Sequence, residues 1–353
     1  MTTINCHKEI KGYHANKVTL SNDDQAEMRE RRDNGRTRLK NGLTKASHPL
    51  PDEFSSQGSY AMRTMAQDDA YDYDIDDGVY FSKEYLKDLN GDHLGASDAR
   101  KRIRDALKDD RLTYDAVAKT NCVRQQYPEG YHIDIPVYRT IRSKDIWGNE
   151  VIEYELASGD DWVMSDARKV TRWYNDAVGS ELKAGQSDTS QLRRITKLTK
   201  KMARSRVAWK KKTASGICIS KLVVDHFVAR LDRDDDALRD TWTAIKTQLV
   251  FSQQISHPIS DKNLAEEGDE CVIFFRDCLS DALEALKVLD DYDCTRKKAG
   301  DAWDKVFNTD YFSIQVDKDA TEAKSLLKPA AVASVGLTFP SRPVVPNKSS
   351  GFA

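Results

Sequence analysis

Two short stretches in which acidic and apolar residues alternate constrain the fold of this chain more than any other feature of its sequence. They are residues 74–78 (DIDDG) and residues 130–139 (GYHIDIPVYR). Successive side chains of a β-strand point to opposite faces, so Asp74 and Asp76 are expected to share one face. The alternation in the second stretch predicts a half-buried strand with Asp134 on its polar face. An aspartate inside a strand is unusual, because strands favour β-branched and aromatic residues.

These aspartates predict a metal site. Two carboxylates side by side repel each other and raise each other's pKa, so such a pair is unfavourable unless a cation compensates it. Magnesium suits a carboxylate and phosphate environment. If the two strands are neighbours, Asp134 joins Asp74 and Asp76 in a site that can hold two Mg²⁺ ions, with Mn²⁺ as the alternative, about 4 Å apart. Such a site drives in-line displacement at phosphorus.

A Gly-Ser turn supports this interpretation. Acidic clusters more often form solvated loops, but Gly58-Ser59 lies fifteen residues before Asp74. Glycine lets backbone amides and a hydroxyl approach a phosphate closely. The combination of this turn, the paired aspartates and the separate aspartate on a second strand favours phosphoryl chemistry.

Most of the remaining chain reads as helical. A cap at Ser21 precedes a long charged helix over 25–45, and residues 96–120 also read as a helix. From about residue 160 onward the apolar residues recur at helical spacing. The last 25 residues hold four of the nine prolines and predict a flexible tail.

Composition excludes several classes of protein. The chain of 353 residues allows one two-lobed unit. Its 55 basic and 57 acidic residues exclude a uniformly basic coat for nucleic acid. No apolar run approaches the roughly 20 residues needed to cross a bilayer, and the N-terminus lacks the apolar core of a signal peptide. We therefore expect a cytoplasmic protein without a membrane partner.

One stretch is locally basic. Residues 193–212 contain ten Lys or Arg and no acidic residue. In a helix its apolar and basic residues separate onto opposite faces: Leu192, Ile195, Leu198 and Met202 on one, and Arg193, Lys197, Lys200 and Arg204 on the other. Three interpretations stay open: a solvated surface, a clamp for a triphosphate, or a patch for a nucleic-acid backbone.

The motifs resemble one family. Gln57-Gly58-Ser59, the string DIDDGVY at 74–80 and the string HIDIPVY at 132–138 closely resemble the bacterial cGAS/DncV-like nucleotidyltransferases (CD-NTases), in particular the DncV-type branch. The resemblance implies an α+β fold with a polymerase-β-type nucleotidyltransferase palm, built on a mixed sheet, and a C-terminal helical lobe. We expect the catalytic lobe with an N-terminal helix over 1–165, the helical lobe over 166–325 and the flexible tail over 326–353.

The same resemblance assigns the site. Asp74 and Asp76 are expected to hold both metal ions and Asp134 one of them. The residues expected to bind nucleotide phosphates are Gln57, Gly58, Ser59, Lys200 and Ser215, with Lys197, Lys201 and Ser220 as alternatives if the alignment slips. The closing segment 302–312 matches the family pattern except that Asn308 stands where glycine is usual.

The resemblance also implies substrates and partners. We expect ATP and GTP to be joined, with release of pyrophosphate, into a cyclic oligonucleotide second messenger for anti-phage defence, such as cyclic GMP–AMP. An E1/E2-like enzyme is expected to act on the C-terminal Ala353. Two rival functions remain: a non-cyclising nucleotidyltransferase that modifies RNA or a protein, and a non-enzymatic nucleotide-binding module.

Overall fold

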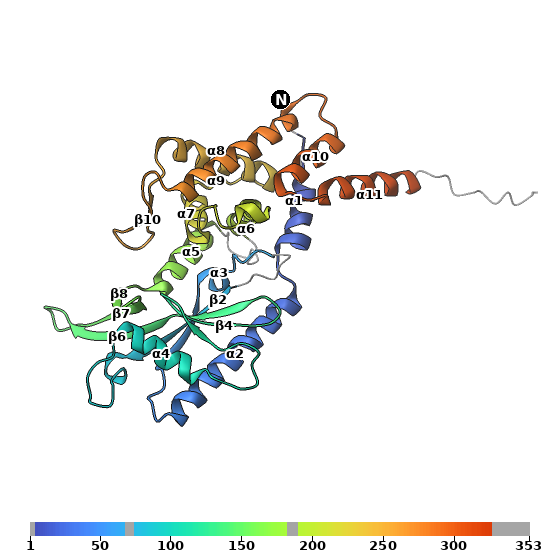
Figure 1. Ribbon diagram of the computed structural model, residues 1–353. Coiled ribbons are helices and arrows are strands. Elements are labelled where there is room, and N and C mark those ends of the chain that lie inside the picture. The colour runs from blue at the N-terminus through green and yellow to red at the C-terminus, as the bar shows by residue number, and fades with distance from the viewer. Residues whose placement is uncertain (1–3, 68–73, 182–189, 327–353) are drawn as a thin grey trace, which may run out of the picture.

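The chain folds around two hydrophobic cores, one under a sheet and one among helices (Figure 1). The computed structural model describes residues 4–67, 74–181 and 190–326. The predicted tail lies, from residue 327, outside the described residues, as does Ala353 with the E1/E2-like partner predicted for it. The arrangement of a sheet-bearing lobe below a helical lobe agrees with the α+β architecture expected from the sequence.

The sheet is mixed and runs in the order β3-β4-β5-β2-β6-β7-β8, with β1 paired to β2. Its strands are β1 (Glu53–Gln57), β2 (Asp74–Ser82), β3 (Val117–Ala118), β4 (Val123–Gln126), β5 (His132–Ile135), β6 (Val137–Lys144), β7 (Glu150–Ser158) and β8 (Asp161–Met164). β5 and β6 both pair with β2 in parallel, whereas β1 pairs with it antiparallel. The central β2 therefore places its aspartates beside β5.

Two expectations were wrong, one about the burial of the stretch 130–139 and one about the length of the helix that begins at residue 96. The stretch 130–139 is not half-buried, because every residue from Tyr131 to Tyr138 is buried. Its polar face is covered by neighbouring side chains of the same sheet, such as Tyr80, which stacks on Tyr138 with ring centroids 4.5 Å apart. The helix predicted over 96–120 ends early, since α4 covers only Ala96–Ala106. The chain after it turns back to form the antiparallel pair β3–β4, which widens the sheet at the β5 edge.

The long charged helix is present as α2 (Asn22–Lys45), and Ser21 caps it as predicted. The Ser21 hydroxyl accepts a hydrogen bond from the Asp24 amide at 3.0 Å. Two glycines lie inside this helix, in different surroundings. A Cβ on Gly42 would lie 1.9 Å from the carbonyl oxygen of Ala106 in α4, whereas a Cβ on Gly35 would meet nothing within 4 Å. Only Gly42 is therefore required for the contact between α2 and α4.

This difference predicts opposite effects of one substitution. Gly35→Ala should raise the free energy of unfolding by about 0.5–1 kcal/mol, because alanine loses less backbone entropy in a helix. Gly42→Ala should lower it by about 1–3 kcal/mol, because the added methyl group forces the two helices apart. Urea unfolding of both variants measures the two shifts. A stabilised Gly42→Ala protein would show that the helices are not packed this closely in solution.

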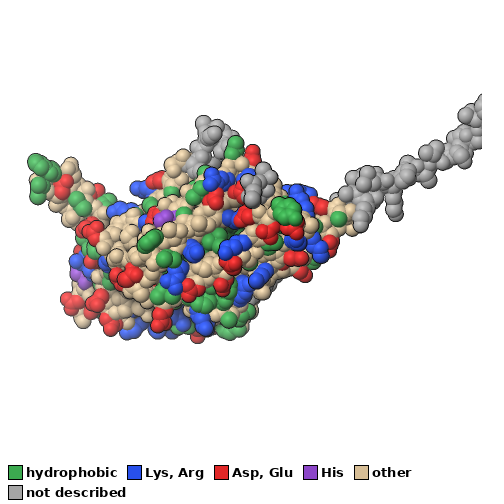
Figure 2. Space-filling model, turned by 90° about the horizontal axis from the view of Figure 1, so that it is seen from above, with side chains coloured by type: hydrophobic (Ala, Val, Ile, Leu, Met, Phe, Trp, Pro, Cys, Tyr) green, Lys and Arg blue, Asp and Glu red, His purple; other side chains and the backbone are tan. Residues whose placement is uncertain are grey.

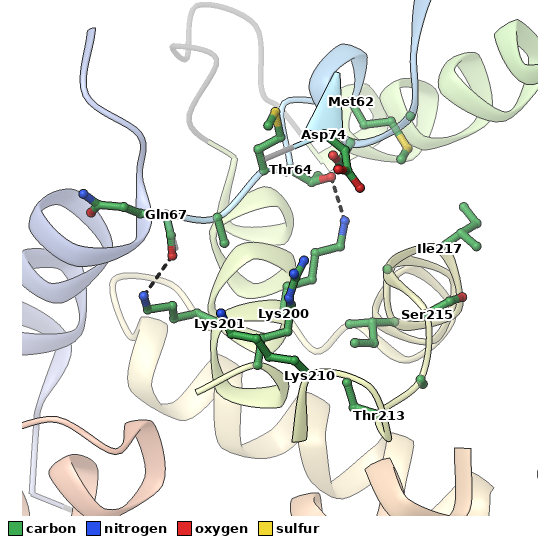
Figure 3. A pocket seen from close by; sticks show the side chains of 18 of the residues that line it. Met62, Thr64, Gln67, Asp74, Lys200, Lys201, Lys210, Thr213, Ser215 and Ile217 are labelled. Atoms are coloured by element: carbon green, nitrogen blue, oxygen red, sulfur yellow. Dashed lines mark hydrogen bonds between the residues drawn. The ribbon is translucent and has the colours of Figure 1, made fainter. Parts of the chain in front are cut away.

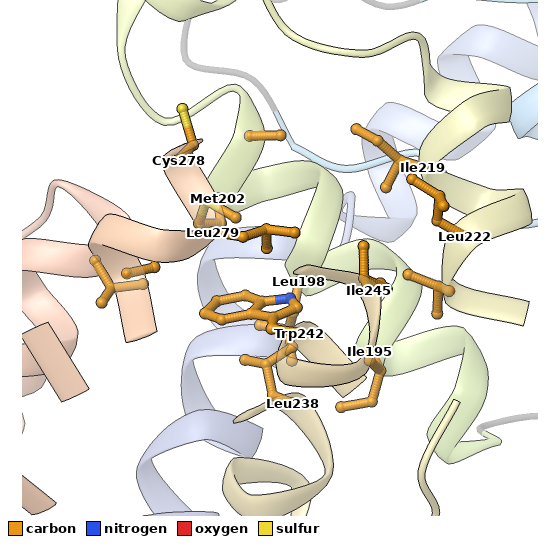
Figure 4. Packing of buried hydrophobic residues seen from close by; sticks show 14 of the residues in the cluster. Ile195, Leu198, Met202, Ile219, Leu222, Leu238, Trp242, Ile245, Cys278 and Leu279 are labelled. Carbon is orange, nitrogen blue, oxygen red and sulfur yellow. The ribbon is translucent and has the colours of Figure 1, made fainter. Parts of the chain in front are cut away.

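The helical lobe follows the sheet. Its helices are α5 (Ala167–Glu181), α6 (Gln191–Ala203), α7 (Gly216–His226), α8 (Asp234–Phe251), α9 (Glu270–Ala285), α10 (Arg296–Phe307) and α11 (Tyr311–Leu326), with a small hairpin of β9 (Ile255–Ser256) and β10 (Asn263–Ala265). The Trp242 indole lies at the centre of the core and donates a hydrogen bond to the Thr199 hydroxyl at 2.9 Å (Figure 4). Trp303, Phe307 and Phe312 are buried in this core.

The N-terminal segment belongs to the helical core. α1 (His7–Tyr13) and the following π-helix (His14–Val18) bury Ile10, Tyr13 and Val18 against the helical lobe. The chain thus passes through the helical core before it builds the sheet, which the expected division at residue 165 does not capture. No helix in the described parts of the chain is long and apolar enough to cross a bilayer.

The surface carries both signs of charge. In Figure 2, basic and acidic side chains are interspersed on the face shown, in keeping with the near-balanced composition. The hairpin of β6 and β7 projects from the body and ends in the exposed side chains of Ile146 and Trp147. A uniformly basic coat is therefore absent from this face.

Candidate active site

A cavity of about 1260 Å³ lies between the two lobes. It is lined from the sheet side by residues that end β1 and begin β2, and from the helical side by α6, the start of α7 and the turn after α10. Seven of the eight predicted site residues line it: Gln57, Gly58, Ser59, Asp74, Asp76, Lys200 and Ser215. Asp134 is the exception.

The three predicted carboxylates lie on adjacent strands. β2 and β5 pair so that Asp76 is opposite Asp134 and Asp74 is opposite His132. Burial, together with the negative charges of Asp134 and Asp74, raises the pKa of Asp76 to about 7. Burial is the largest single influence on Asp74 and works against its ionisation, but the hydrogen bond to the His132 ring and the positive charges of His132, Arg124 and Arg204 together lower the pKa of Asp74. Of these two aspartates, Asp76 is therefore the one whose pKa is raised, as the sequence predicted for neighbouring carboxylates.

Asp134 has a different environment. Arg124 on β4 donates two hydrogen bonds to its carboxylate, from Nε to Oδ1 and from Nη2 to Oδ2, both at 2.7 Å. The Asp134 side chain is 12% exposed. The register thus brings Asp134 beside Asp76, while its oxygens are held by a neighbouring strand.

The donor set fits divalent cations. Three carboxylates from β2 and β5 lie close enough together that burial and the charges of Asp134 and Asp74 raise the pKa of Asp76. A bound cation would compensate such a cluster of like charges. Oxygen ligands of this kind are those preferred by Mg²⁺ and Mn²⁺. Within the described residues, however, no three side chains are arranged as a finished metal site.

The Gly-Ser turn lies directly against the aspartates. Gly58 begins the short helix α3 (Gly58–Ala61) with a φ of +63°. A Cβ at this position would lie 2.1 Å from Oδ2 of Asp76, so both the backbone conformation and the contact require glycine. The next residue, Ser59, lines the cavity.

Gln57 has a buried side chain that is bonded to tyrosines of the sheet. Its side chain is 5% exposed, and its Nε2 donates to the Tyr138 hydroxyl at 3.1 Å. Its Oε1 accepts from the Tyr80 hydroxyl at 3.5 Å. These contacts favour a role for Gln57 in holding the turn that precedes Gly58, in place of the phosphate contact expected from the sequence.

Lys200 extends from the helical lobe toward Asp74 and Thr64 (Figure 3). Its Nζ donates a hydrogen bond to the Thr64 hydroxyl at 2.8 Å. Burial, assisted by the positive charges of Arg204 and Lys197, lowers the pKa of Lys200 to about 7. The alternative Lys201 is directed elsewhere and donates to the Gln67 carbonyl at 2.8 Å. Lys197 is not among the residues that line the cavity, and Lys201 lines it but donates to the Gln67 carbonyl, so the geometry favours Lys200 as the phosphate ligand near Asp74.

The start of α7 bears on which serine hydroxyl, that of Ser215 or that of Ser220, lies toward the cavity. Ser215 is the N-cap, its Oγ accepts from the Cys218 amide at 3.3 Å, and it lines the cavity. The alternative Ser220 is buried and donates to the Gly216 carbonyl of its own helix at 2.8 Å. The geometry therefore favours Ser215.

The basic stretch 193–212 is not one helix, since α6 ends at Ala203. Arg193 and Lys200 are buried, so a purely solvated basic face is wrong for these two positions. Arg204 and Lys210 line the cavity. The nucleic-acid interpretation of this stretch stays a prediction.

Two further residues line the cavity: Thr64, which was not predicted from the sequence, and Asn308, which stands where glycine is usual. Thr64 follows the Gly-Ser turn without any motif that marks it, and only its contact with Lys200 reveals it. Asn308 adopts the left-handed conformation with φ 53° and ψ 57°, which asparagine tolerates better than most residues. Its side chain donates to the Ser205 carbonyl at 3.1 Å. The turn that glycine usually makes is therefore preserved.

Comparison with known proteins agrees with this geometry. Residues 52–138 match the family described as cyclic GMP-AMP synthase DncV-like, nucleotidyltransferase domain. The fold is similar to that of the DncV cyclic AMP-GMP synthase of Vibrio cholerae in complex with the linear intermediate 5′ pppA(3′,5′)pG, with a TM-score of 0.66 and 16% identity over 87% of this chain and 96% of that chain. It is also similar to Escherichia coli DncV bound to 3′-deoxy GTP, with a TM-score of 0.64 and 15% identity over 84% of this chain and 93% of that chain.

At these identities the structural likeness shows a shared fold. It confirms the predicted α+β architecture with a mixed sheet. The family match includes the segment from Gln57 to Tyr138, and so all three aspartates and the Gly-Ser turn. The resemblance read from the motifs is confirmed: residues 52–138 form a DncV-like nucleotidyltransferase domain.

Proposed function

We propose that this chain, with a DncV-like nucleotidyltransferase domain at residues 52–138, is a metal-dependent enzyme that joins two nucleoside triphosphates into a cyclic dinucleotide and releases pyrophosphate at each transfer. One observation carries this proposal. Asp74 and Asp76 line the same cavity as the buried Lys200, and burial together with the negative charges of Asp134 and Asp74 raises the pKa of Asp76 to about 7. That arrangement is suited to cations and phosphates together.

Each side chain has a distinct task in this proposal. Asp74, Asp76 and Asp134 would hold Mg²⁺ ions, which would supply neutralisation of phosphate charge and a lower pKa for the attacking ribose hydroxyl. The Gly58 amide and the Ser59 hydroxyl bind the donor phosphates from the sheet side. From the helical side, the Lys200 ammonium and the Ser215 hydroxyl bind the same phosphates. Positioning and charge neutralisation are then the protein's main contribution to nucleotidyl transfer.

The size of the cavity supports two nucleotides. Its volume of about 1260 Å³ exceeds the range of roughly 300–1,000 Å³ that is usual for pockets of a single small ligand. The structure of Vibrio cholerae DncV that has a similar fold holds a linear dinucleotide intermediate. Another, of a variant of that protein, is a complex with ATP and GTP. We therefore infer ATP and GTP as substrates, cyclic GMP–AMP as the product and anti-phage signalling as the role.

Product identification tests the proposal. The purified protein is incubated with all four nucleoside triphosphates and Mg²⁺ or Mn²⁺, and the products are identified by mass spectrometry. A cyclic dinucleotide that disappears on chelation of the metal is the expected result. Nucleotide attached to RNA or to a protein would support the non-cyclising rival instead. Absence of any product with either metal would favour a nucleotide-binding module.

Lys200 gives a prediction specific to the triphosphate. Lys200→Ala should weaken binding of a nucleoside triphosphate about ten-fold or more, because a charge-assisted contact to phosphate is worth roughly 1.5–3 kcal/mol. Binding of the monophosphate should change little. Lys201→Ala is the matched control, since its ammonium is directed to the Gln67 carbonyl. Equal losses for the triphosphate and the monophosphate would show that Lys200 does not contact the β- and γ-phosphates.

The lowered pKa of Lys200 adds a second readout. With a pKa of about 7, this lysine is partly neutral at pH 7.5 in the free protein. A bound triphosphate favours the charged form, so binding should take up a proton, and the affinity should fall as the pH rises from about 6.5 to 8.5. Calorimetry in two buffers of different ionisation enthalpy measures this uptake, which Lys200→Ala should reduce. Identical enthalpies in the two buffers would contradict the prediction.

A further inference from the structure

The ion pair between Arg124 and Asp134 has a consequence for metal binding. The two residues are direct cross-strand partners on β4 and β5. The guanidinium forms two parallel hydrogen bonds to the carboxylate, each 2.7 Å long, so both oxygens of Asp134 have a cationic partner. Planar bidentate pairs of this kind are among the strongest hydrogen bonds that side chains make.

The other two predicted metal-binding aspartates differ from Asp134 in their position relative to the cavity. Asp74 and Asp76 line the cavity, whereas Asp134 does not, although its strand register places it opposite Asp76. The Cys122 thiol lies against the same carboxylate, and burial together with the Asp134 charge raises the pKa of that thiol to about 12. Asp134 is thus held by Arg124 of β4 and contacted by Cys122, which precedes β4, and it does not line the cavity that Asp74 and Asp76 line.

We propose that Arg124 is the resident counter-ion of the third metal-binding carboxylate: it holds Asp134 in the metal-free protein and has to release at least one of its oxygens when a divalent cation binds. This inference rests on the proposed function, in which Asp134 is a metal ligand. Arg124 therefore competes with the cation and sets how tightly the site binds it. It is a positioning residue, because it acts on the metal through Asp134.

The position of Arg124 permits such a release. Its side chain is 34% exposed, so the guanidinium can exchange the carboxylate for water without being stranded in the core. β4 is a four-residue strand, and among the described strands the two-residue β3 alone lies beyond it. Asp74 also lies close enough to favour the charged guanidinium. The arginine thus remains solvated and near negative charge after Asp134 has turned toward the cavity.

Metal binding without nucleotide tests the proposal independently of activity. Free Mn²⁺ is measured by electron paramagnetic resonance during titration of the full chain at pH 8 and low ionic strength. Arg124→Gln should bind Mn²⁺ at least about ten-fold more tightly than the wild type, because the cation no longer displaces a charge-assisted pair. Arg142→Gln is the matched control. It removes one positive charge and the exposed Arg142–Glu150 pair on the same sheet, and it should bind Mn²⁺ like the wild type.

A double-mutant cycle separates the ion pair from the general effect of charge. In an Asp134→Asn background, Arg124→Gln should no longer tighten Mn²⁺ binding, since its partner is gone. The same tightening in both backgrounds would assign the effect to long-range charge and overturn the proposal. Unchanged or weaker Mn²⁺ binding by Arg124→Gln alone would also overturn it.

Two further measurements keep these outcomes unambiguous. Circular dichroism melting shows whether Arg124→Gln is folded. If Arg124→Gln is unfolded, Arg124→Lys takes its place in the titration, because lysine retains the charge but cannot form two parallel hydrogen bonds. Failure of the proposed function has a different signature. In that case the wild-type protein binds no Mn²⁺ and forms no product, whereas failure of this inference leaves wild-type metal binding intact and insensitive to Arg124.

Discussion

Replacement of both Asp74 and Asp76 by asparagine is expected to reduce nucleotidyl transfer roughly a thousand-fold or more while the protein stays folded. The two carboxylates line the cavity from one strand, and cations at such a site contribute several kcal/mol of charge stabilisation in the transition state. Asparagine preserves the shape of each side chain but removes its charge. Product formation from labelled nucleoside triphosphates measures the loss. Glu153→Gln, which alters an exposed carboxylate on β7, is the control.

The stability of the same variants separates a catalytic role from a structural one. The pKa of Asp76 is about 7 in the folded protein, above its value of 3.8 in a model compound. The folded state therefore binds more protons than the unfolded state between these values, and ionisation of Asp76 lowers stability as the pH rises through about 7. Asp76→Asn removes this penalty. Its melting temperature should equal or exceed that of the wild type at pH 8, and the difference should shrink toward pH 5.

Two results would contradict this assignment. Turnover by a folded Asp74→Asn, Asp76→Asn protein would show that the carboxylates are not needed for transfer. A large loss of stability in Asp76→Asn without metal would show that Asp76 stabilises the sheet. Both are measured on the same preparations, by product analysis and by thermal melting.

Gly58→Ala is expected to lower turnover about a hundred-fold, although it adds only one methyl group. The added Cβ would lie 2.1 Å from Oδ2 of Asp76, so the carboxylate or the turn has to move. A displacement of about 1 Å at a reacting centre can decrease the rate by this factor. Steady-state kinetics with saturating nucleotide measure the effect.

Gly148 offers a matched control for this substitution. It has a positive φ of +82°, like Gly58 at +63°, but a Cβ there would meet nothing within 4 Å. Both alanine variants should therefore lose a similar amount of stability from the left-handed backbone, about 1–2 kcal/mol. Only Gly58→Ala should lose activity. Equal turnover of the two variants would mean that the turn does not position Asp76.

Local sequence was sufficient for several features of the fold and the site. Alternation over 74–76 places Asp74 and Asp76 on one strand face, because side chains of a strand alternate whatever surrounds them. The Ser21 cap depends only on neighbours in the first turn of α2. The helical spacing of apolar residues after about residue 160 likewise places Trp303 and Phe307 on one buried face of α10. The motif strings identified the nucleotidyltransferase domain, since its chemistry needs those residue types at those spacings.

Tertiary structure decided what happens to these groups. Arg124 meets Asp134 only because β4 and β5 pair in one register, and Lys200 has a pKa near 7 only because two lobes bury it beside Thr64. Gly35 and Gly42 are equivalent in the sequence of α2, yet only Gly42 touches α4. The sequence by itself determined which side chains share a face, a property of the local backbone. Their charge states, partners and tolerance of an added atom depend on segments distant in the chain, whose approach no local period encodes.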